Sequence, residues 1–327
     1  MNKILITTVP FGSENKLPIE LLDNLNIEYL INPLNKKLTE SELLEMTSDV
    51  DIIIAGTEPI TKKVIDSAKN LKMISRVGIG LDSVDLVAAK AKGIKVCYTP
   101  DAPAPAVAEL TIGVMLTLLR SLHVSNSQLH NGQWSRIFGR RLAEITIGVI
   151  GMGRIGGRVL RRTQAFGTPR LLVNDIMPND SSNKELKLEW ASKEKIFEEA
   201  DIISLHVPLT KLTKNMVTKK ELLSMKKDAM VINVSRGGII NEQDLYDVMK
   251  GGHLSGAAID VFENEPYQGN LSEIERCFLT AHMGSMSMDC RSKMEIEATE
   301  EVIRFIKNRK LMNEVPQVEY DIQHDGL

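Results

Sequence analysis

Short apolar runs rich in β-branched residues alternate with stretches of helical periodicity along the first hundred residues. Residues 4–9 and 50–55 are mostly apolar at consecutive positions, which is typical of strands buried on both faces of a parallel sheet. Thr61 precedes one helical stretch as its expected N-cap. The predicted strands are residues 4–9, 50–55, 72–77 and 94–98, and the predicted helices are residues 18–24, 39–46, 61–69 and 84–92. This alternation predicts an open, mostly parallel α/β unit.

The same alternation resumes at residue 145, after a junction with three prolines within residues 100–105. Proline continues neither a helix interior nor a central strand, so we expect the chain to cross into a second domain here. Residues 106–122 predict a long apolar helix. The predicted strands that follow are residues 145–150, 171–174, 201–207, 229–234, 255–260 and 277–280.

A last helix is predicted at about residues 289–307, followed by a polar tail. A chain that enters the second domain near residue 100 and leaves it near residue 285 is expected to return this helix to the first domain. We therefore predict an α/β protein with two doubly wound parallel-sheet domains. The outer domain comprises residues 1–100 plus 286–327, and the inserted domain comprises residues 101–285.

The strand predicted at residues 145–150 ends in a glycine-rich turn, Gly151-x-Gly153-x-x-Gly156, and a helical pattern follows. Gly151 permits a tight turn, Gly153 lets a pyrophosphate approach the backbone, and Gly156 lets the helix pack closely on the strand. The helix N-terminus then presents N–H groups and a positive dipole end to phosphates. This context predicts a Rossmann-type dinucleotide site, although a purely structural strand-to-helix turn has the same local pattern.

Asp175 closes the next apolar run, about 20 residues after the turn, where this fold places the carboxylate that binds a ribose 2′-OH. Ile176, Met177 and Pro178 follow it, with no Arg or Lys to bind a 2′-phosphate. Because a carboxylate repels that phosphate, NAD is favoured over NADP as the cofactor.

The composition limits the partners. The chain has 327 residues, of which 43% are hydrophobic and 25% charged, and its formal net charge of -3 predicts neither nucleic acid nor an anionic membrane as partner. No apolar run is long enough to span a bilayer, and the N-terminus lacks the pattern of a signal peptide. Cys97, Cys277 and Cys290 lack metal-type spacing, so we expect no metal site, and free thiols in a reducing cytoplasm.

Three polar residues each follow a predicted strand of the second domain: Arg236, Glu265 and His282. Each alone has an ordinary structural interpretation, as a solvated loop charge, a turn residue before proline, or a strand-end histidine. The order of the three residues and the motifs around them favour a shared catalytic role over these separate interpretations. Val-Ser-Arg-Gly-Gly-Ile-Ile, Asp-Val-Phe-Glu-Asn-Glu-Pro and Thr-Ala-His-Met-Gly-Ser together resemble the D-isomer-specific 2-hydroxyacid dehydrogenases. Gly-Met-Gly-Arg-Ile-Gly, His-Val-Pro-Leu-Thr and Arg-Val-Gly-Ile-Gly-Leu-Asp-Ser-Val-Asp match the same family. The chain is most similar to its D-3-phosphoglycerate dehydrogenase branch, in a short form without a regulatory domain.

The resemblance implies a catalytic role for each of the three residues. Arg236 would bind the substrate carboxylate and polarise its keto oxygen, since a guanidinium fork suits two oxygens at once. His282 would be the general acid in reduction and the base in oxidation, because imidazole titrates near neutrality. Glu265 would hold the imidazole and favour its protonated form.

The resemblance also implies that the nucleotide domain is inserted into a flavodoxin-like substrate domain, in which the backbone N–H groups of Val77 and Gly78 hold the substrate carboxylate. It implies a homodimer through residues 106–142. For a phosphorylated substrate, Arg76 is the remaining substrate-binding candidate, together with Arg136 reaching from a neighbouring subunit, since two arginines can bind a phosphate. The implied contacts with NAD are Gly151, Gly153, Arg154, Ile155, Gly156, Asp175, His206, Val207, Pro208, Val234, Asp260 and Gly284.

The substrate is less well defined. The branch resemblance favours 3-phosphoglycerate and its 2-keto partner, but residues 54–59 read Ile-Ala-Gly-Thr-Glu-Pro, where phosphoglycerate enzymes often have a basic residue. An unphosphorylated 2-hydroxyacid or a phosphonate analogue is the alternative. An NAD-sensing, corepressor-like binding protein and an oxidase of formate or phosphite are further interpretations of the same pattern.

Overall fold

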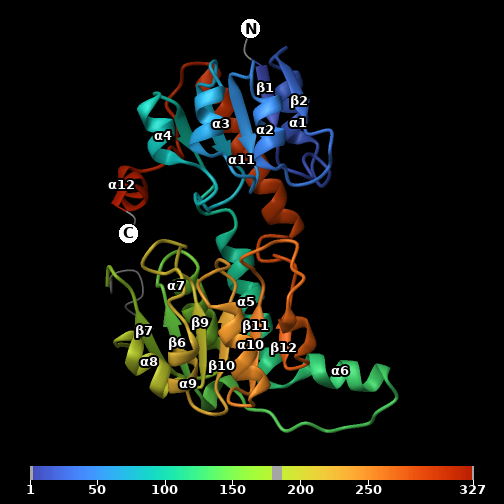
Figure 1. Ribbon diagram of the computed structural model, residues 1–327, viewed down its shortest axis with the longest axis vertical. Coiled ribbons are helices and arrows are strands. Elements are labelled where there is room, and N and C mark those ends of the chain that lie inside the picture. The colour runs from blue at the N-terminus through green and yellow to red at the C-terminus, as the bar shows by residue number, and fades with distance from the viewer. Residues whose placement is uncertain (1–2, 179–185, 326–327) are drawn as a thin grey trace. The chain divides into compact units, whose positions relative to one another are not determined.

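The computed structural model describes residues 3–178 and 186–325, and the chain divides into two compact units. Unit 1 comprises Met1–Pro103 together with Met286–Leu327, and unit 2 comprises Ala104–Ser285. Each unit is a parallel sheet covered by helices, so the α/β fold predicted from the sequence is confirmed (Figure 1).

The sheet of unit 1 has five parallel strands in the order β2-β1-β3-β4-β5, the flavodoxin-like order. The strands are β1 (Lys3–Ile6), β2 (Glu28–Ile31), β3 (Ile52–Ala55), β4 (Met73–Arg76) and β5 (Lys95–Cys97). The helices are α1 (Leu17–Asp23), α2 (Glu40–Met46), α3 (Lys62–Ser67), α4 (Leu86–Ala91), α11 (Met288–Ile306) and α12 (Gln317–Asp325). A buried cluster joins α2, α3 and α4 to one face of this sheet, while α11 contacts β3 and β4 and packs against α1. The predicted N-cap is present, since Thr61 Oγ1 accepts a hydrogen bond from Val64 N.

The sheet of unit 2 has seven parallel strands in the order β12-β11-β10-β9-β6-β7-β8. This is the doubly wound order of a dinucleotide-binding domain with one strand added. The strands are β6 (Thr146–Ile150), β7 (Arg170–Asn174), β8 (Leu188–Trp190), β9 (Ile202–Leu205), β10 (Met230–Asn233), β11 (Gly256–Ile259) and β12 (Cys277–Leu279). The helices are α5 (Ala104–Leu119), α6 (Leu122–His130), α7 (Gly156–Thr163), α8 (Lys193–Glu199), α9 (Lys219–Ser224) and α10 (Glu242–Lys250).

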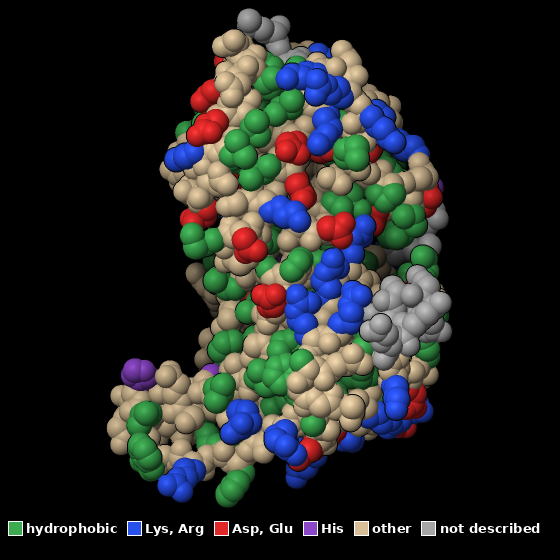
Figure 2. All heavy atoms as spheres, turned by 180° about the vertical axis from the view of Figure 1, so that it is seen from behind, with side chains coloured by type: hydrophobic (Ala, Val, Ile, Leu, Met, Phe, Trp, Pro, Cys, Tyr) green, Lys and Arg blue, Asp and Glu red, His purple; other side chains and the backbone are tan. Residues whose placement is uncertain are grey.

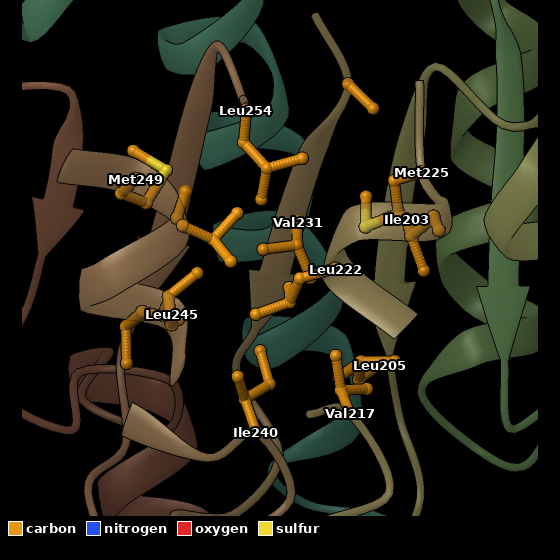
Figure 3. Close-up of a cluster of buried hydrophobic side chains, with 14 of the residues drawn as sticks. Ile203, Leu205, Val217, Leu222, Met225, Val231, Ile240, Leu245, Met249 and Leu254 are labelled. Atoms are coloured by element: carbon orange, nitrogen blue, oxygen red, sulfur yellow. The ribbon is translucent and has the colours of Figure 1, made fainter. Parts of the chain in front are cut away.

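Two apolar layers hold this sheet. Helices α8, α9 and α10 cover one face, where Leu222 of α9 and Leu245 of α10 pack over Ile203 and Val231 of the strands (Figure 3). Helices α5 and α7 cover the other face. Because the central strands are buried on both faces, their sequences read as continuous apolar runs. The layers hold the carboxyl ends of β6, β9, β10 and β11 at one edge, where this fold binds ligands.

Three local expectations need correction. The helix predicted at residues 106–122 is two helices, because Ser121 has a left-handed φ of 47° that interrupts the hydrogen-bond ladder after α5. Part of the expected polar tail forms α12. Strands β2 and β8 lie at sheet edges and were not predicted. Within the described ranges, no single helix has the length and hydropathy of a membrane span, although α5 and α6 reach them together across a 64° bend.

Candidate active site

The turn between β6 and α7 contains three glycines, of which Gly151 and Gly156 have no room for a side chain. Gly151 has a φ of 96°, and a Cβ there would lie 2.5 Å from the carbonyl oxygen of His206. A Cβ on Gly156 would lie 2.0 Å from the carbonyl oxygen of Gly151. A Cβ on Gly153, in contrast, would meet nothing within 4 Å, so the turn is open on that side. This opening, beside the first turn of α7, fits the pyrophosphate of a dinucleotide.

Asp175 follows β7 and is tied to the same turn. Its Oδ2 accepts a hydrogen bond from Met152 N at 2.7 Å, and its Oδ1 accepts one from Met177 N at 2.8 Å. Each carboxylate oxygen has two acceptor positions, so both retain capacity for a hydroxyl group. The residues at this edge therefore fit a ribose diol beside the pyrophosphate position.

His206 lies at the carboxyl end of β9, before Val207 and Pro208. Its Nε2 lies 2.8 Å from Ser204 Oγ, and its Nδ1 is buried with no hydrogen-bond partner among the described residues. Burial lowers the pKa of His206 to about 3, so the ring is neutral at physiological pH. His206 O also closes the space beside Gly151, which connects β9 to the glycine turn.

Arg236 is presented by a turn that the side chain of Asn233 organises. Asn233 is 2% exposed at the end of β10, and its Nδ2 donates to Arg236 O at 2.8 Å. Its Oδ1 accepts from Ser235 N at 3.1 Å and from Ser235 Oγ at 2.8 Å. Arg236 Nη1 donates to Ser235 O at 2.7 Å. The sequence pattern identified Arg236, whereas the role of Asn233 became visible only in three dimensions.

Glu265 and His282 come together from loops that follow β11 and β12. His282 Nδ1 lies 3.0 Å from Glu265 Oε2 and 3.1 Å from Oε1. Glu265 Oε1 also accepts a hydrogen bond from Phe262 N at 3.1 Å, which anchors the carboxylate to its own loop. Because Nδ1 faces the carboxylate, Nε2 is the ring nitrogen left to face another molecule.

Asp260 holds the loop that carries His282. It is 1% exposed at the end of β11 and accepts hydrogen bonds from Thr280 Oγ1 at 2.5 Å, Met283 N at 2.6 Å and Gly284 N at 2.9 Å. His282 itself has a left-handed φ of 53°, an uncommon conformation for a residue with a side chain. Asp260 therefore fixes by hydrogen bonds the residues on both sides of His282, whose backbone is strained.

The loop after β4 in unit 1 carries Val77 and Gly78, whose N–H groups are expected to hold the substrate carboxylate. Val77 N donates to Ala55 O at 2.8 Å, and Gly78 N donates to Thr99 Oγ1 at 2.8 Å. These two N–H groups are thus hydrogen-bonded inside unit 1, and their expected role in holding a substrate carboxylate stays a prediction. Arg76 is 5% exposed and its Nη1 donates to Val77 O, so its guanidinium lies under this loop.

The described residues contain no group of three or more His, Cys, Asp or Glu side chains placed to hold a metal ion. The three cysteines are buried and free, and burial raises the pKa of Cys277 to about 12.

Comparisons with known proteins place the chain among characterised relatives. Residues 112–284 match the model of a family described as D-isomer specific 2-hydroxyacid dehydrogenase, NAD binding domain. The chain is 35% identical over 277 residues to the hydroxypyruvate reductase of Thermotoga maritima, covering 83% of this chain and 89% of the relative. It is 36% identical over 284 residues to the D-3-phosphoglycerate dehydrogenase of Methanocaldococcus jannaschii, covering 85% of this chain and 54% of the relative. The chain therefore spans about half of the latter's length. The crystal structure of the TT0316 protein from Thermus thermophilus is similar with a TM-score of 0.86 at 30% identity, covering 96% of this chain and 100% of that one.

Proposed function

The chain belongs to the D-isomer-specific 2-hydroxyacid dehydrogenase family, and from that premise we propose that it transfers a hydride between NAD(H) and a small D-2-hydroxyacid or its 2-keto partner. Membership makes it an NAD-dependent oxidoreductase. The observation that carries the assignment of its catalytic centre is the contact of His282 Nδ1 with Glu265 in the same unit that contains the glycine turn and Arg236.

His282 is the proton donor and acceptor in this proposal. In reduction, Nε2 of the protonated ring gives its proton to the keto oxygen, and in oxidation the neutral ring takes the hydroxyl proton. Glu265 fixes Nδ1 as the protonated position and stabilises the imidazolium while the ring is charged. NADH, when bound, supplies the hydride.

Arg236 is the proposed carboxylate clamp. A guanidinium presents parallel N–H donors that match two oxygens, so it orients the substrate and withdraws charge from the keto oxygen. The turn that Asn233 organises fixes the backbone of Arg236, which reduces the motion of the clamp.

The remaining nucleotide residues surround the turn and the strand ends. We propose that the pyrophosphate lies against Gly151–Gly156, with Arg154 and Ile155 in the first turn, and that Asp175 binds the adenosine ribose. His206, Val207 and Pro208 would then face the adenine, while Val234, Asp260 and Gly284 lie toward the nicotinamide. Asp260 has the further task of holding the His282 loop.

We propose an unphosphorylated 2-keto acid of the size of hydroxypyruvate as substrate, in place of the phosphorylated one that the branch resemblance suggested. Glu58 is 1% exposed after β3 and accepts hydrogen bonds from Gly56 N at 2.7 Å and from the hydroxyl of Thr7. Arg76 lies under its own loop. Both Glu58 and Arg76 are therefore buried, so the Arg76 guanidinium is not presented to a phosphate here, which supports a neutral substrate tail.

The test is NADH oxidation, followed at about 340 nm because the reduced nicotinamide absorbs there, against hydroxypyruvate, glyoxylate, pyruvate and 3-phosphohydroxypyruvate. Arg236→Ala and His282→Ala should each lose on the order of 100-fold or more in turnover while NADH still binds. Arg161→Ala and His324→Ala, on α7 and α12, remove the same side-chain types and should leave turnover unchanged. Wild-type rates in the Arg236 or His282 variant would refute the catalytic assignment. A preference for the phosphorylated acid would overturn the substrate proposal alone.

We further propose a homodimer formed through the arm, defined as α6 and residues 131–141. In Figure 1 the arm stands away from the body of unit 2, and Figure 2 shows hydrophobic side chains on it. Trp134 is 81% exposed and Phe138 is fully exposed, which is unusual for large apolar side chains on a monomer. Sedimentation of the Trp134→Ser/Phe138→Ser double variant should show monomers where the wild type shows dimers. A wild type that sediments as a monomer would contradict this proposal.

We also propose a cytoplasmic location, because buried free thiols are typical of proteins in a reducing compartment.

A further inference from the structure

We propose that Gly237 is a positioning residue whose missing side chain sets the spacing between Arg236 and the Glu265–His282 pair. The loops after β10 and β11 pack backbone to backbone at this glycine. The inference rests on the proposed roles of Arg236, Glu265 and His282, and it adds a residue that has no side chain to take part in the chemistry.

The packing at Gly237 is closer than any side chain permits. A Cβ there would lie 2.0 Å from Phe262 C, 2.1 Å from Phe262 O and 2.4 Å from Glu263 N. Carbon atoms in ordinary contact are about 3.5 Å apart or more, so a methyl group would force the two segments apart by roughly 1.5 Å. The atoms it would meet are backbone atoms, which cannot rotate away as a flexible side chain could.

The loop on the far side of this contact carries the partner of His282. Phe262 N donates to Glu265 Oε1 at 3.1 Å, so the same residue that touches Gly237 also anchors the carboxylate. The next amide, Glu263 N, donates to Glu242 Oε1 at 2.7 Å at the start of α10. Burial and the neighbouring Glu263 and Glu265 carboxylates raise the pKa of Glu242, which agrees with its place beside this loop.

The near side of the contact is held just as firmly. Asn233 Nδ2 donates to Arg236 O at 2.8 Å, and Asn233 Oδ1 receives both the N–H and the hydroxyl of Ser235. Neither segment can therefore absorb an added methyl group without moving a proposed catalytic side chain. The displacement would change the distance from the Arg236 guanidinium to the imidazole of His282.

Gly238 provides a matched control on the adjacent position. Its φ is 78°, and a Cβ there would lie 3.8 Å from Leu209 Cδ1, an ordinary contact distance. Gly238→Ala thus introduces backbone strain without separating the two loops. Both variants add one methyl group to the protein, and they add it at adjacent positions of the chain.

The test compares Gly237→Ala with Gly238→Ala in the full-length protein. A misplacement of about 1 Å can cost on the order of 100-fold in turnover, so Gly237→Ala should lower kcat/KM by roughly that factor and Gly238→Ala by less than about threefold. The fall should lie mainly in kcat, with a larger primary isotope effect from 4-deuterated NADH, because the hydride step becomes slower. The dissociation constant for NADH should stay within about twofold of the wild type, because the glycine turn is untouched.

Two results would overturn the proposal. One is a folded Gly237→Ala protein with wild-type kcat/KM, and the other is an equal loss in both glycine variants. If Gly237→Ala does not fold, Glu242→Ala decides the matter, because it frees the Phe262–Glu263 segment without a clash. A fall in kcat with NADH binding intact would support the inference, and unchanged kcat would refute it. Failure of the proposed function is separately visible, since the wild type would then turn over no 2-keto acid.

Discussion

Replacing Asp260 by asparagine tests how the protein holds His282, because the two side chains have nearly the same shape. The aspartate carboxylate accepts three hydrogen bonds, from Thr280 Oγ1, Met283 N and Gly284 N. The asparagine oxygen can replace Oδ1 and keep the first two. Its amide nitrogen then faces Gly284 N, so that a donor meets a donor and the charge of the acceptor is lost.

The structure sets the size of the effect. A hydrogen bond to a charged group contributes about 1.5–3 kcal/mol, and a buried N–H left without an acceptor costs about 1–3 kcal/mol. These contributions overlap, so we expect Asp260→Asn to destabilise unit 2 by about 3 kcal/mol. His282 has a left-handed φ of 53°, and such a conformation costs a residue with a side chain about 1–2 kcal/mol. Once the grip is weakened the loop can relax, which should lower kcat by roughly tenfold or more.

Urea unfolding followed by tryptophan fluorescence measures the loss of stability in Asp260→Asn. Both tryptophans of the chain, Trp134 and Trp190, lie in unit 2, so the signal reports the unit that contains Asp260. Thr280→Val is the matched control, because it removes one hydroxyl partner and keeps the carboxylate, and it should cost about 1 kcal/mol. A change below about 0.5 kcal/mol in Asp260→Asn, with unaltered kcat, would refute the view that this carboxylate grips the His282 loop.

Three further predictions concern separate parts of the molecule. Burial lowers the pKa of His206 to about 3 in the folded protein, whereas in the unfolded chain this ring has its ordinary pKa of about 6.5. The unfolded state therefore binds a proton below about pH 6.5 that the folded state does not bind, and the free energy of unfolding falls as the pH drops through that value. Between pH 7.5 and 5.5 the free energy of unfolding should fall by about 1.4 kcal/mol from this ring alone, and His206→Gln should lack that increment in urea titrations at the two pH values. Gln323 of α12 accepts a hydrogen bond from Leu86 N at 2.6 Å and donates one to Val84 O at 2.9 Å. Gln323→Ala should therefore destabilise unit 1 by about 1.5 kcal/mol, measured in circular-dichroism melts. A loss of stability no larger than that of the exposed Gln317→Ala would contradict this. Gly153→Ala should leave the stability of unit 2 within about 0.5 kcal/mol of the wild type, because the added methyl group meets no protein atom within 4 Å. The same variant should weaken NADH binding by roughly tenfold in fluorescence titrations. An unaltered affinity for NADH would argue against a pyrophosphate at this turn.

The buried strands were predictable because burial on both faces leaves a continuous apolar run. β3 and β9 have this pattern, and the predicted runs contain both strands. The edge strands β2 and β8 are partly exposed along their length, so their residues show no such run. Each of these strands pairs on one side only, β2 with β1 and β8 with β7, and this pairing leaves no mark in the strand's own residues.

The C-terminal helix was missed for a related reason. α12 is polar over most of its length, and the contacts that hold it are made with α4 through residues such as Gln323. A helix without a strong apolar stripe is stabilised by the surface on which it packs, and that surface lies more than 200 residues away in the chain. The break after α5 depends on the left-handed conformation of Ser121. Serine seldom adopts this conformation, so the sequence does not predict it.

The sequence by itself determined the class of fold, the glycine turn with Asp175, and the three polar residues at strand ends, because each is a local pattern of residue type and spacing. Only the tertiary structure decided how these residues work together. It brought His282 Nδ1 to 3.0 Å from Glu265 Oε2. It also placed hydrogen-bond acceptors of unit 1 against the N–H groups of Val77 and Gly78. It also left no room for a side chain at Gly237. These facts depend on strand order and on the packing of loops far apart in the chain, which no local pattern of residues encodes.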